Sequence, residues 1–555
     1  MAGNLRVAHL RSPRRLQNLL LGLCVLCYAA PLLRIAVVAA QTLVRRTDQG
    51  GGDLGLVLVN ARMARIIGLT CGQTLASVVV CLGIGIPVGW AVGRRTVHGS
   101  SVLGALLLAP FALPTVTVAL AMFAIVGSPP DSLSGRFLLI VGAHALFNVG
   151  LVVRTVALAV EALPVQAEEA AASLGASAKS RWLHLRLPLL SPAIASSALL
   201  VALLSLTSFG AVVLLGGHGM TTLEVEVWVL ATRQFDLGAA ALLAVGQFFL
   251  VVLLLLAFER TARWSQQWSG LGIELRPLQS STTKARVYPT RAGLTSLASW
   301  ATALTLVGVP LGALVMRSGF DNGQWTWSRY VDLFGNKVVP LRGVDFVEVL
   351  WRSVGNAGVA TVVATLIAVP VAIASRNQRV TRPVNRATSL SLGVPATLMG
   401  LGYLLLASGP PVDLRSSRWL LPVVQGILAA PICVRILAPP VSQIGRGVIE
   451  AARTLNSSGI DQAVRVWLPP LLRPLAFSAG CAFAFSIGEF GASSFLARSG
   501  DPTLTQLVAR ILSRPSVVSL SQACALSLLI GTLAVGAIVL PSGGVGLLRV
   551  GGRRA

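Results

Sequence analysis

A stretch of twenty residues occurs twice in this chain. Residues 169–188 read EAAASLGASAKSRWLHLRLP, and residues 450–469 read EAARTLNSSGIDQAVRVWLP. Both copies begin with Glu-Ala-Ala, have a turn-forming residue (Gly175 or Asn456) at the seventh position, and end with Leu-Pro. Each copy lies in a polar interval between long apolar segments. We therefore predict two membrane bundles that each present one such interval on the same side.

The composition is typical of a polytopic membrane protein. Of 555 residues, 54% are hydrophobic and only 12% are charged, which is unlike a soluble enzyme. A hydrocarbon layer about 30 Å thick requires roughly 20 apolar residues per helix. Because the apolar runs are continuous rather than alternating, we predict an all-α fold. The twelve predicted helices are 17–40, 66–92, 101–126, 137–160, 189–216, 238–258, 292–316, 353–374, 387–408, 419–441, 472–497 and 518–541.

The distribution of charge predicts the orientation in the membrane. If the first helix enters from the cytoplasm, the cytoplasmic segments hold 25 Lys and Arg residues and the outer segments hold 16. This asymmetry follows the positive-inside rule. It places both termini and both Glu-Ala-Ala intervals in the cytoplasm, and it accounts for the net charge of +25 without nucleic acid as a partner.

The first polar interval, residues 161–187, predicts a helix-turn-helix element. Residues 165–174 are rich in Ala and Glu, which favour helix, and Gly175 suits the positive φ common at a helix end. Residues 178–187 predict a second short helix that ends at Pro188. The second interval, residues 442–470, repeats this pattern.

The chain is predicted to contain an internal duplication. A single offset serves five pairs of landmarks, and such agreement indicates repeats. We divide the chain into a first six-helix repeat, residues 1–258, a cytoplasmic linker, 259–291, and a second repeat, 292–555. Two six-helix repeats enter the membrane in the same direction, so the repeat is parallel. The pairs, at an offset of 281 positions, are Glu169 and Glu450, Pro188 and Pro469, Arg154 and Arg435, Pro114 and Pro395, and Phe209 and Phe490.

The sequence contains no motif for nucleotide chemistry or catalysis. A P-loop requires Gly-Lys followed by Ser or Thr, whereas the three lysines, Lys179, Lys284 and Lys337, follow Ala, Thr and Asn. No cluster of His, Asp and Glu predicts a catalytic or metal site. We therefore expect no catalytic residues, no metal and no cofactor in this chain.

The two intervals resemble the EAA loops of bacterial ABC importer permeases, with the pattern E-A-A, three residues, G, nine residues, I-x-L-P. The first copy departs from it at Leu185, and the second at Val466 and Asn456, where Asn tolerates a left-handed backbone. Finer motifs resemble the fused permeases of the iron(III)/thiamine importer group. They are AHALFN at 143–148, TSFG at 207–210, TTLEVE at 221–226 and SIGEFG at 486–491.

The resemblance implies a MetI-like permease fold in the bacterial inner membrane. It implies two ABC ATPase subunits beneath the EAA loops, which hold ATP and Mg, and a substrate-binding protein that docks outside. It also implies which residues couple to the ATPase. These are Glu169, Ala170, Ala171, Gly175, Leu187 and Pro188 in the first EAA loop, and Glu450, Ala451, Ala452, Asn456, Leu468 and Pro469 in the second.

Glu489 is the main candidate for the substrate pathway. It lies in an apolar segment beside Phe490, and its counterparts in the first repeat are Ser208 and Phe209. A carboxylate inside a membrane is costly and often lines a pathway, and ferric ion and thiamine are both cations. A structural role at a helix end is an equal alternative. The acids of residues 221–226, Glu224 and Glu226, are expected to face solvent in an outer loop, with the lining of an entrance as the alternative.

The predicted function is the permease subunit of an ATP-driven importer for a small substrate of the ferric iron or thiamine class. One alternative is an ion-gradient-driven secondary transporter with two six-helix repeats, which would not need paired EAA loops. Another is a membrane-embedded enzyme, which lacks a candidate site. The sequence does not decide the cargo, although residues 221–226 favour thiamine slightly.

Overall fold

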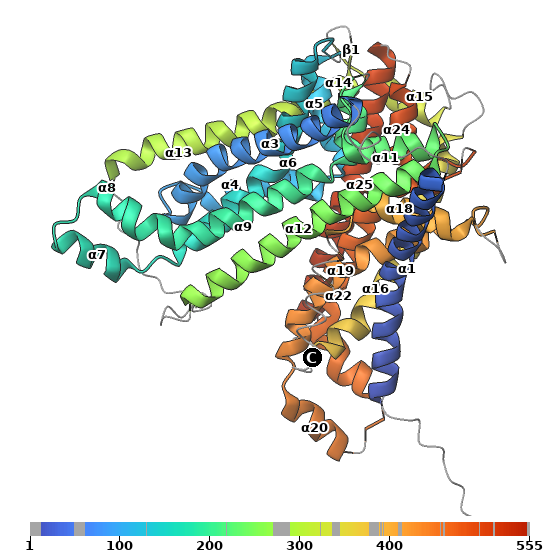
Figure 1. The fold of residues 1–555 in the computed structure, drawn as a ribbon. Helices are drawn as coiled ribbons and strands as arrows, with labels where there is room; N and C mark the ends of the chain where they lie inside the picture. Colours follow the sequence, from blue (N-terminus) through green and yellow to red (C-terminus); the bar gives the residue numbers. More distant parts are fainter. Residues whose placement is uncertain are drawn as a thin grey trace, which may run out of the picture. The chain divides into compact units, whose positions relative to one another are not determined.

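The computed structural model is helical apart from one short hairpin, β1 (Phe320–Asp321) with β2 (Gln324–Trp325), among the residues it describes (Figure 1). Those residues are 13–48, 61–128, 130–217, 219–269, 289–321, 324–335, 345–376, 388, 391, 393–408, 413–455, 457–458, 461–498, 500–513 and 517–551. Within them ten helices are long and apolar enough to cross a membrane, or eleven if one bent pair counts as a span. The predicted all-α polytopic fold is confirmed, whereas the predicted count of twelve spans is not.

The chain forms two compact units, and each draws on both halves of the sequence. Unit 1 comprises residues 1–37, 351–498 and 533–555, and unit 2 comprises 38–350 and 499–532. The helix at the start of each predicted repeat therefore packs mainly within the bundle of the other repeat. The units differ from the repeats for this reason, and the repeat boundaries stay a prediction from the sequence.

Unit 2 is built on α3 (Ala61–Gly93), α6 (Leu133–Glu161) and α9 (Leu187–Leu206), which pack against one another. The long helix α12 (Leu237–Ser269) packs against α9. The remaining elements of unit 2, besides the hairpin, are α4 (Ser100–Leu108), η1 (Ala109–Ala112), α5 (Thr115–Val126), α7 (Val165–Ser173), α8 (Ala178–Arg181), η2 (Trp182–Arg186), α10 (Phe209–Gly216), α11 (Leu223–Thr232), α13 (Pro289–Ala303), η3 (Leu304–Gly308), α14 (Val309–Gly319), α15 (Ser328–Phe334) and α24 (Leu504–Leu512).

Unit 1 is built on α16 (Phe346–Ala374), α19 (Leu420–Gln443) and α22 (Leu468–Gly488). Alanines of α16 at four-residue spacing meet Cys433 and Leu437 of α19 in its core. The other elements are α18 (Ala396–Ala407), α20 (Arg446–Thr454), η4 (Gln462–Trp467) and α23 (Ser493–Leu496). Three helices contribute residues to both units: α1 (Pro13–Asp48), α25 (Val517–Gly551) and, through its first residues, α16.

Element boundaries recur at the offset of 281 residues that relates the two sequence copies. Helix α5 shifted by this offset has the bounds of α18, and α7 shifted in the same way has the bounds of α20. Pro114 and Pro395 precede the first pair of helices. The correspondence therefore extends from residue identities to the positions where helices begin and end.

The first helix of each repeat, which packs mainly in the bundle of the other repeat, is held there by hydrogen bonds to main-chain carbonyls. In unit 1 the Tyr403 hydroxyl donates to the carbonyl of Cys27 on α1 at 2.7 Å, and Tyr28 donates to the carbonyl of Ile427. In unit 2 the Trp300 indole N–H on α13 donates to the carbonyl of His98 at 3.0 Å. Each bond satisfies a polar group on an apolar helix, so the exchanged helix has a fixed register.

The predicted single helix 101–126 is wrong, because this segment is bent by 105° between η1 and α5. Leu113 and Pro114 are both extended, with ψ of 147° and 141°. Proline lacks an amide hydrogen and disfavours helical geometry in the residue before it. The break could not be predicted from the apolar composition of the segment, but the presence of Pro114 indicates it.

The structure also divides the predicted helices 189–216 and 472–497. The first is interrupted at residues 207–208, between α9 and α10, and the second ends at Gly488 before the short helix α23. The two interruptions are related by the same offset. Of the predicted helix 387–408, the structure describes α18 and only scattered residues before it.

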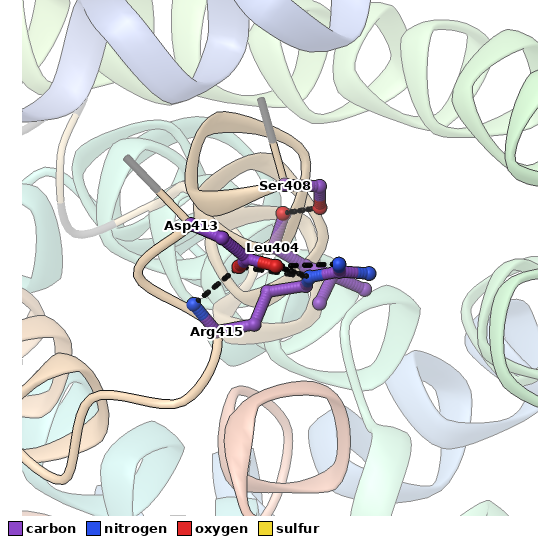
Figure 2. Close-up of polar contacts among 4 residues, drawn as sticks. All are labelled: Leu404, Ser408, Asp413 and Arg415. Carbon is purple, nitrogen blue, oxygen red and sulfur yellow. Dashed lines mark hydrogen bonds and ion pairs between the residues drawn. The ribbon is translucent and has the colours of Figure 1, made fainter. Parts of the chain in front are cut away.

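The turn before α19 is organised by a local ion pair (Figure 2). The Asp413 carboxylate accepts hydrogen bonds from the Arg415 guanidinium, at 2.6 Å and 3.0 Å, and from the Arg415 amide at 2.9 Å. These bonds hold the pKa of Asp413 at about 2, below its ordinary value. The pair is therefore charged across the physiological range and fixes this exposed turn.

Helices α3 and α6 approach closely through a stripe of glycines. Gly85, Gly89 and Gly93 recur at four-residue spacing and face valines of α6. A methyl group on Gly89 would lie 2.9 Å from the carbonyl oxygen of Val153 and 2.9 Å from Val156 Cβ. Small residues at this spacing let membrane helices pack backbone to backbone.

Gly89→Ala should therefore destabilise unit 2 by about 1–3 kcal/mol, the usual effect of overpacking. Gly83, on the same helix, has no atom within 4 Å of an added methyl group. Gly83→Ala is the matched control and should be neutral or stabilise by up to about 1 kcal/mol through helix propensity. Thermal unfolding in detergent, followed by size-exclusion chromatography, measures both. Equal melting temperatures for the two variants would contradict the close approach.

Candidate functional sites in the EAA loops and at the helix breaks

The first EAA loop has the predicted turn. Helix α7 ends at Ser173, and Gly175 adopts a φ of +78°. The amide of Ala176 donates to the carbonyl of Ala171 at 3.0 Å, and the amide of Gly175 donates to Ala172 at 3.0 Å. This pair of bonds is the Schellman motif that closes a helix C-terminus. The second alanine of Glu-Ala-Ala therefore supplies a carbonyl that fixes the turn.

The Glu-Ala-Ala motif and the turn of the first loop are largely exposed to solvent. Glu169 and Ala170 are exposed, Ala171 is half-buried, and Leu174 is 87% exposed at the tip of the turn. Figure 1 shows α7 and α8 at one end of the bundle formed by α3, α6 and α9. Single exposed leucines are common on protein surfaces, so the exposure of Leu174 alone does not identify an interface.

The second EAA loop has the same local geometry where it is described. Glu450 and Ala451 are exposed on α20, and the amide of Ser457 donates to the carbonyl of Ala452 at 3.1 Å. Leu455, which corresponds to Leu174, is 82% exposed. Asn456 lies outside the described residues, so its backbone conformation stays a prediction.

The prediction that Pro188 ends a short helix is wrong. Helix α8 continues through the π-helical turn η2 into α9. Leu187 and Pro188 are the first two residues of α9. The second loop is built in the same way, since η4 leads into α22 at Leu468 and Pro469. A proline inside a helix lacks one backbone donor and disturbs the turn before it, and here a π turn stands directly before the Leu-Pro pair of each loop. Each loop is thus joined directly to a membrane span.

At the break after α22, Glu489 has a clear structural role. Its carboxylate accepts hydrogen bonds from the amides of Ala492 at 2.6 Å and Ser493 at 3.0 Å, and it is 6% exposed. It therefore caps the start of α23. In the first repeat, Ser208 occupies the corresponding break without a side-chain cap, and Phe209 and Phe490 are both buried.

The expectation that the acids of residues 221–226 face solvent is wrong. Glu224 and Glu226 lie on α11 and are 1% and 4% exposed. Glu226 pairs with Arg62 at 2.8 Å. These residues lie between two predicted spans, which is the reason to expect a loop, but they form the first turns of a buried helix. Acids suit this position because the N-terminus of a helix is positive.

Sequence reasoning missed a cluster around Glu168, next to the Glu-Ala-Ala motif. Glu168 pairs with Arg94 at the end of α3 and with Arg186 in η2. The signal that could have found it is a doubled acid, Glu168-Glu169, in a loop interval with arginines near both adjoining spans. The tertiary structure alone shows which of the two acids is paired.

Comparison with known proteins shows similarity to the membrane components of transport systems. Residues 85–268 match the family of binding-protein-dependent transport system inner membrane components. A thiamine transport system permease protein of Brucella abortus is 24% identical over 87% of this chain and 88% of its own length. The corresponding protein of Haemophilus influenzae is 23% identical over 80% of this chain and 82% of its own length. No solved structure gave a match.

A further relative covers only part of the chain. A putative 2-aminoethylphosphonate transport system permease protein of Salmonella choleraesuis is 30% identical over 28% of this chain and 59% of its own length. The family match, the long relatives and the ten apolar spans together support a fused ABC importer permease, a multi-pass protein of the inner membrane. The secondary-transporter alternative is not favoured.

Replacement of Glu489 by Gln tests the cap. One of the two amides at the start of α23 would then face an N–H group, and an unsatisfied buried donor costs about 1–3 kcal/mol. We expect a lower melting temperature in detergent. The exposed Glu161 offers a control, since Glu161→Gln makes the same change of charge at the surface. A melting temperature equal to that of the wild type would show that the cap adds no stability.

Proposed function

We propose that this permease imports thiamine with two copies of an ABC ATPase on its EAA loops and a substrate-binding protein on its opposite face. The observation that carries the proposal is the pair of equivalent turns with exposed Leu174 and Leu455. Two matching docking elements fit two copies of one partner. ATP and Mg then belong to the partner, and this chain performs no hydrolysis itself.

The coupling residues of this proposal are those of the two motifs. The exposed faces of Glu169, Ala170, Glu450 and Ala451 meet the ATPase, and the turns enter clefts on its surface. The Leu-Pro pairs lie where each loop joins its span, so movement of a docked turn reaches α9 or α22 without a flexible joint. Binding and hydrolysis of ATP thereby switch access between the two faces of the membrane.

The proposed cargo is thiamine, because relatives that span most of the chain are thiamine transport permeases. Thiamine carries a positive charge, and the chain holds buried carboxylates in its membrane bundles. The pathway residues of the proposal are Glu489 and Phe490, with Ser208 and Phe209 in the first repeat. Since the Glu489 carboxylate caps α23, it would attract the cation from a fixed position rather than by moving. Ferric ion is the competing cargo, to be distinguished by uptake.

Reconstitution with an ABC ATPase and a thiamine-binding protein from the same organism tests the function. We expect thiamine to stimulate ATP hydrolysis and to accumulate in proteoliposomes. A burial of one leucine contributes about 1.5–3 kcal/mol, so Leu174→Ser or Leu455→Ser should weaken binding of the ATPase about tenfold or more. The double variant should lose uptake.

Phe235, on another loop and 80% exposed, provides the control, since Phe235→Ser should leave ATPase binding unchanged. Full uptake by the double leucine variant would rule out the turns as the docking elements. Stimulation by ferric ion in place of thiamine would identify the other cargo.

The proposed orientation has both termini and both EAA loops in the cytoplasm. In a variant without cysteines, Ser177→Cys and Ser457→Cys should resist a membrane-impermeant thiol reagent in intact spheroplasts and react after lysis. Ser416→Cys, in the exposed turn before α19, should react in intact spheroplasts. The reverse pattern of labelling would invert the topology.

A further inference from the structure

The first EAA loop is fixed to its bundle by an ion cluster centred on Glu168. This residue lies in the first turn of α7. Its carboxylate pairs with Arg94 and takes two bonds from Arg186, with Nε–Oε1 at 3.0 Å and Nη2–Oε2 at 3.4 Å. One side chain therefore joins the loop helix to the end of α3 and to η2. A two-point arginine–carboxylate pair fixes orientation as well as distance.

Two tryptophans complete the cluster. The Arg94 and Arg186 guanidinium carbons lie 4.8 Å and 5.1 Å from the ring centroid of Trp90. The ring of Trp182 lies 5.1 Å from that of Trp90. Both cations gain from the ring, but they repel each other, and the carboxylate offsets this repulsion. The side chains are 12–28% exposed, so water screens the charges only partly.

The described contacts beside the second EAA loop are different. There the Arg376 guanidinium lies 5.0 Å from the ring centroid of Trp467 and donates to the carbonyl of Ile444 at 2.8 Å. This anchor uses a cation, a ring and an uncharged acceptor. At the offset of 281, the positions of Glu168, Arg94, Arg186 and Trp90 are occupied by Ile449, Ser375, Trp467 and Val371.

We propose that Glu168 is a positioning residue for coupling, which acts through Arg94 and Arg186 to hold α7 rigidly on its bundle. The proposal rests on the proposed function for its consequence, but its geometry stands on the contacts above. The first EAA loop then depends on a carboxylate between two cations, whereas the second has Ile449 at the position of Glu168. Without that carboxylate the arginines separate, and α7 loses its attachment to α3.

Hydrogen–deuterium exchange of the permease in lipid nanodiscs measures the attachment directly. Glu168→Gln should speed exchange of the amides of residues 165–173 about tenfold through local opening, with no change in residues 446–454. Glu161→Gln changes the same charge at the exposed end of α6 and is the control. If hydrogen exchange of α7 is the same in Glu168→Gln as in the wild type, the proposal that Glu168 attaches α7 to its bundle is wrong.

A double variant separates electrostatic positioning from simple loss of packing. Glu168→Gln with Arg94→Gln removes one of the two unbalanced cations, so Arg186 can remain over Trp90. Exchange of residues 165–173 should then be slower than in Glu168→Gln alone. Faster exchange in the double variant would show that the arginines support α7 independently of the carboxylate, and would overturn the proposal.

The functional arm compares thiamine uptake per ATP hydrolysed in proteoliposomes that contain the full complex. Glu168→Gln should lower this ratio, because a loosened α7 transmits the movement of a docked turn less completely to its bundle, while the amount of bound ATPase stays unchanged. A wild-type ratio despite faster exchange would overturn the positioning role. Failure of the unmodified permease to bind an ATPase would instead refute the proposed function. The exchange experiment would still test whether Glu168 attaches α7 to its bundle.

Discussion

The structure depends on the need to satisfy backbone hydrogen bonds where water is absent. A membrane helix satisfies its own groups, so every interruption requires a substitute. The Glu489 carboxylate supplies acceptors to the start of α23. At two other helix ends an arginine supplies donors, since Arg136 donates to the carbonyl of Gly216 and Arg317 to that of Ala124. At these three positions a charged side chain thus supplies the hydrogen bonds that a helix end leaves unmade.

The same constraint explains the close packing of the bundles. Lipid offers no hydrophobic gain for contact between apolar helices, so association depends on close approach and on occasional polar contacts. Glycines of α3 provide the approach in unit 2, and Gly426 of α19 provides it against α16 in unit 1, beside the buried alanines of α16. Buried polar contacts such as Ser77 with His144, at 2.8 Å, add specificity to the α3–α6 pair. Two related bundles therefore reach one architecture with different small residues.

The two EAA loops combine a shared outer surface with different attachments. The turns, the exposed leucines and the direct continuation into a span recur in both loops. Behind them, the first loop rests on Glu168 and two arginines, and the second on Arg376 and Trp467. A duplicated scaffold can keep its docking surface constant while its internal contacts diverge, because only the surface must fit two copies of one partner.

The sequence alone determined the membrane class, the paired loops, the turn at Gly175 and the offset that relates the helices. These features follow from local composition, spacing and backbone preference. The tertiary structure decided which helices are exchanged between bundles, that Pro188 lies inside a continuous helix, and that Glu224 and Glu226 are buried. It also decided that Glu168 rather than Glu169 is paired, because that pairing depends on contacts between residues far apart in the chain.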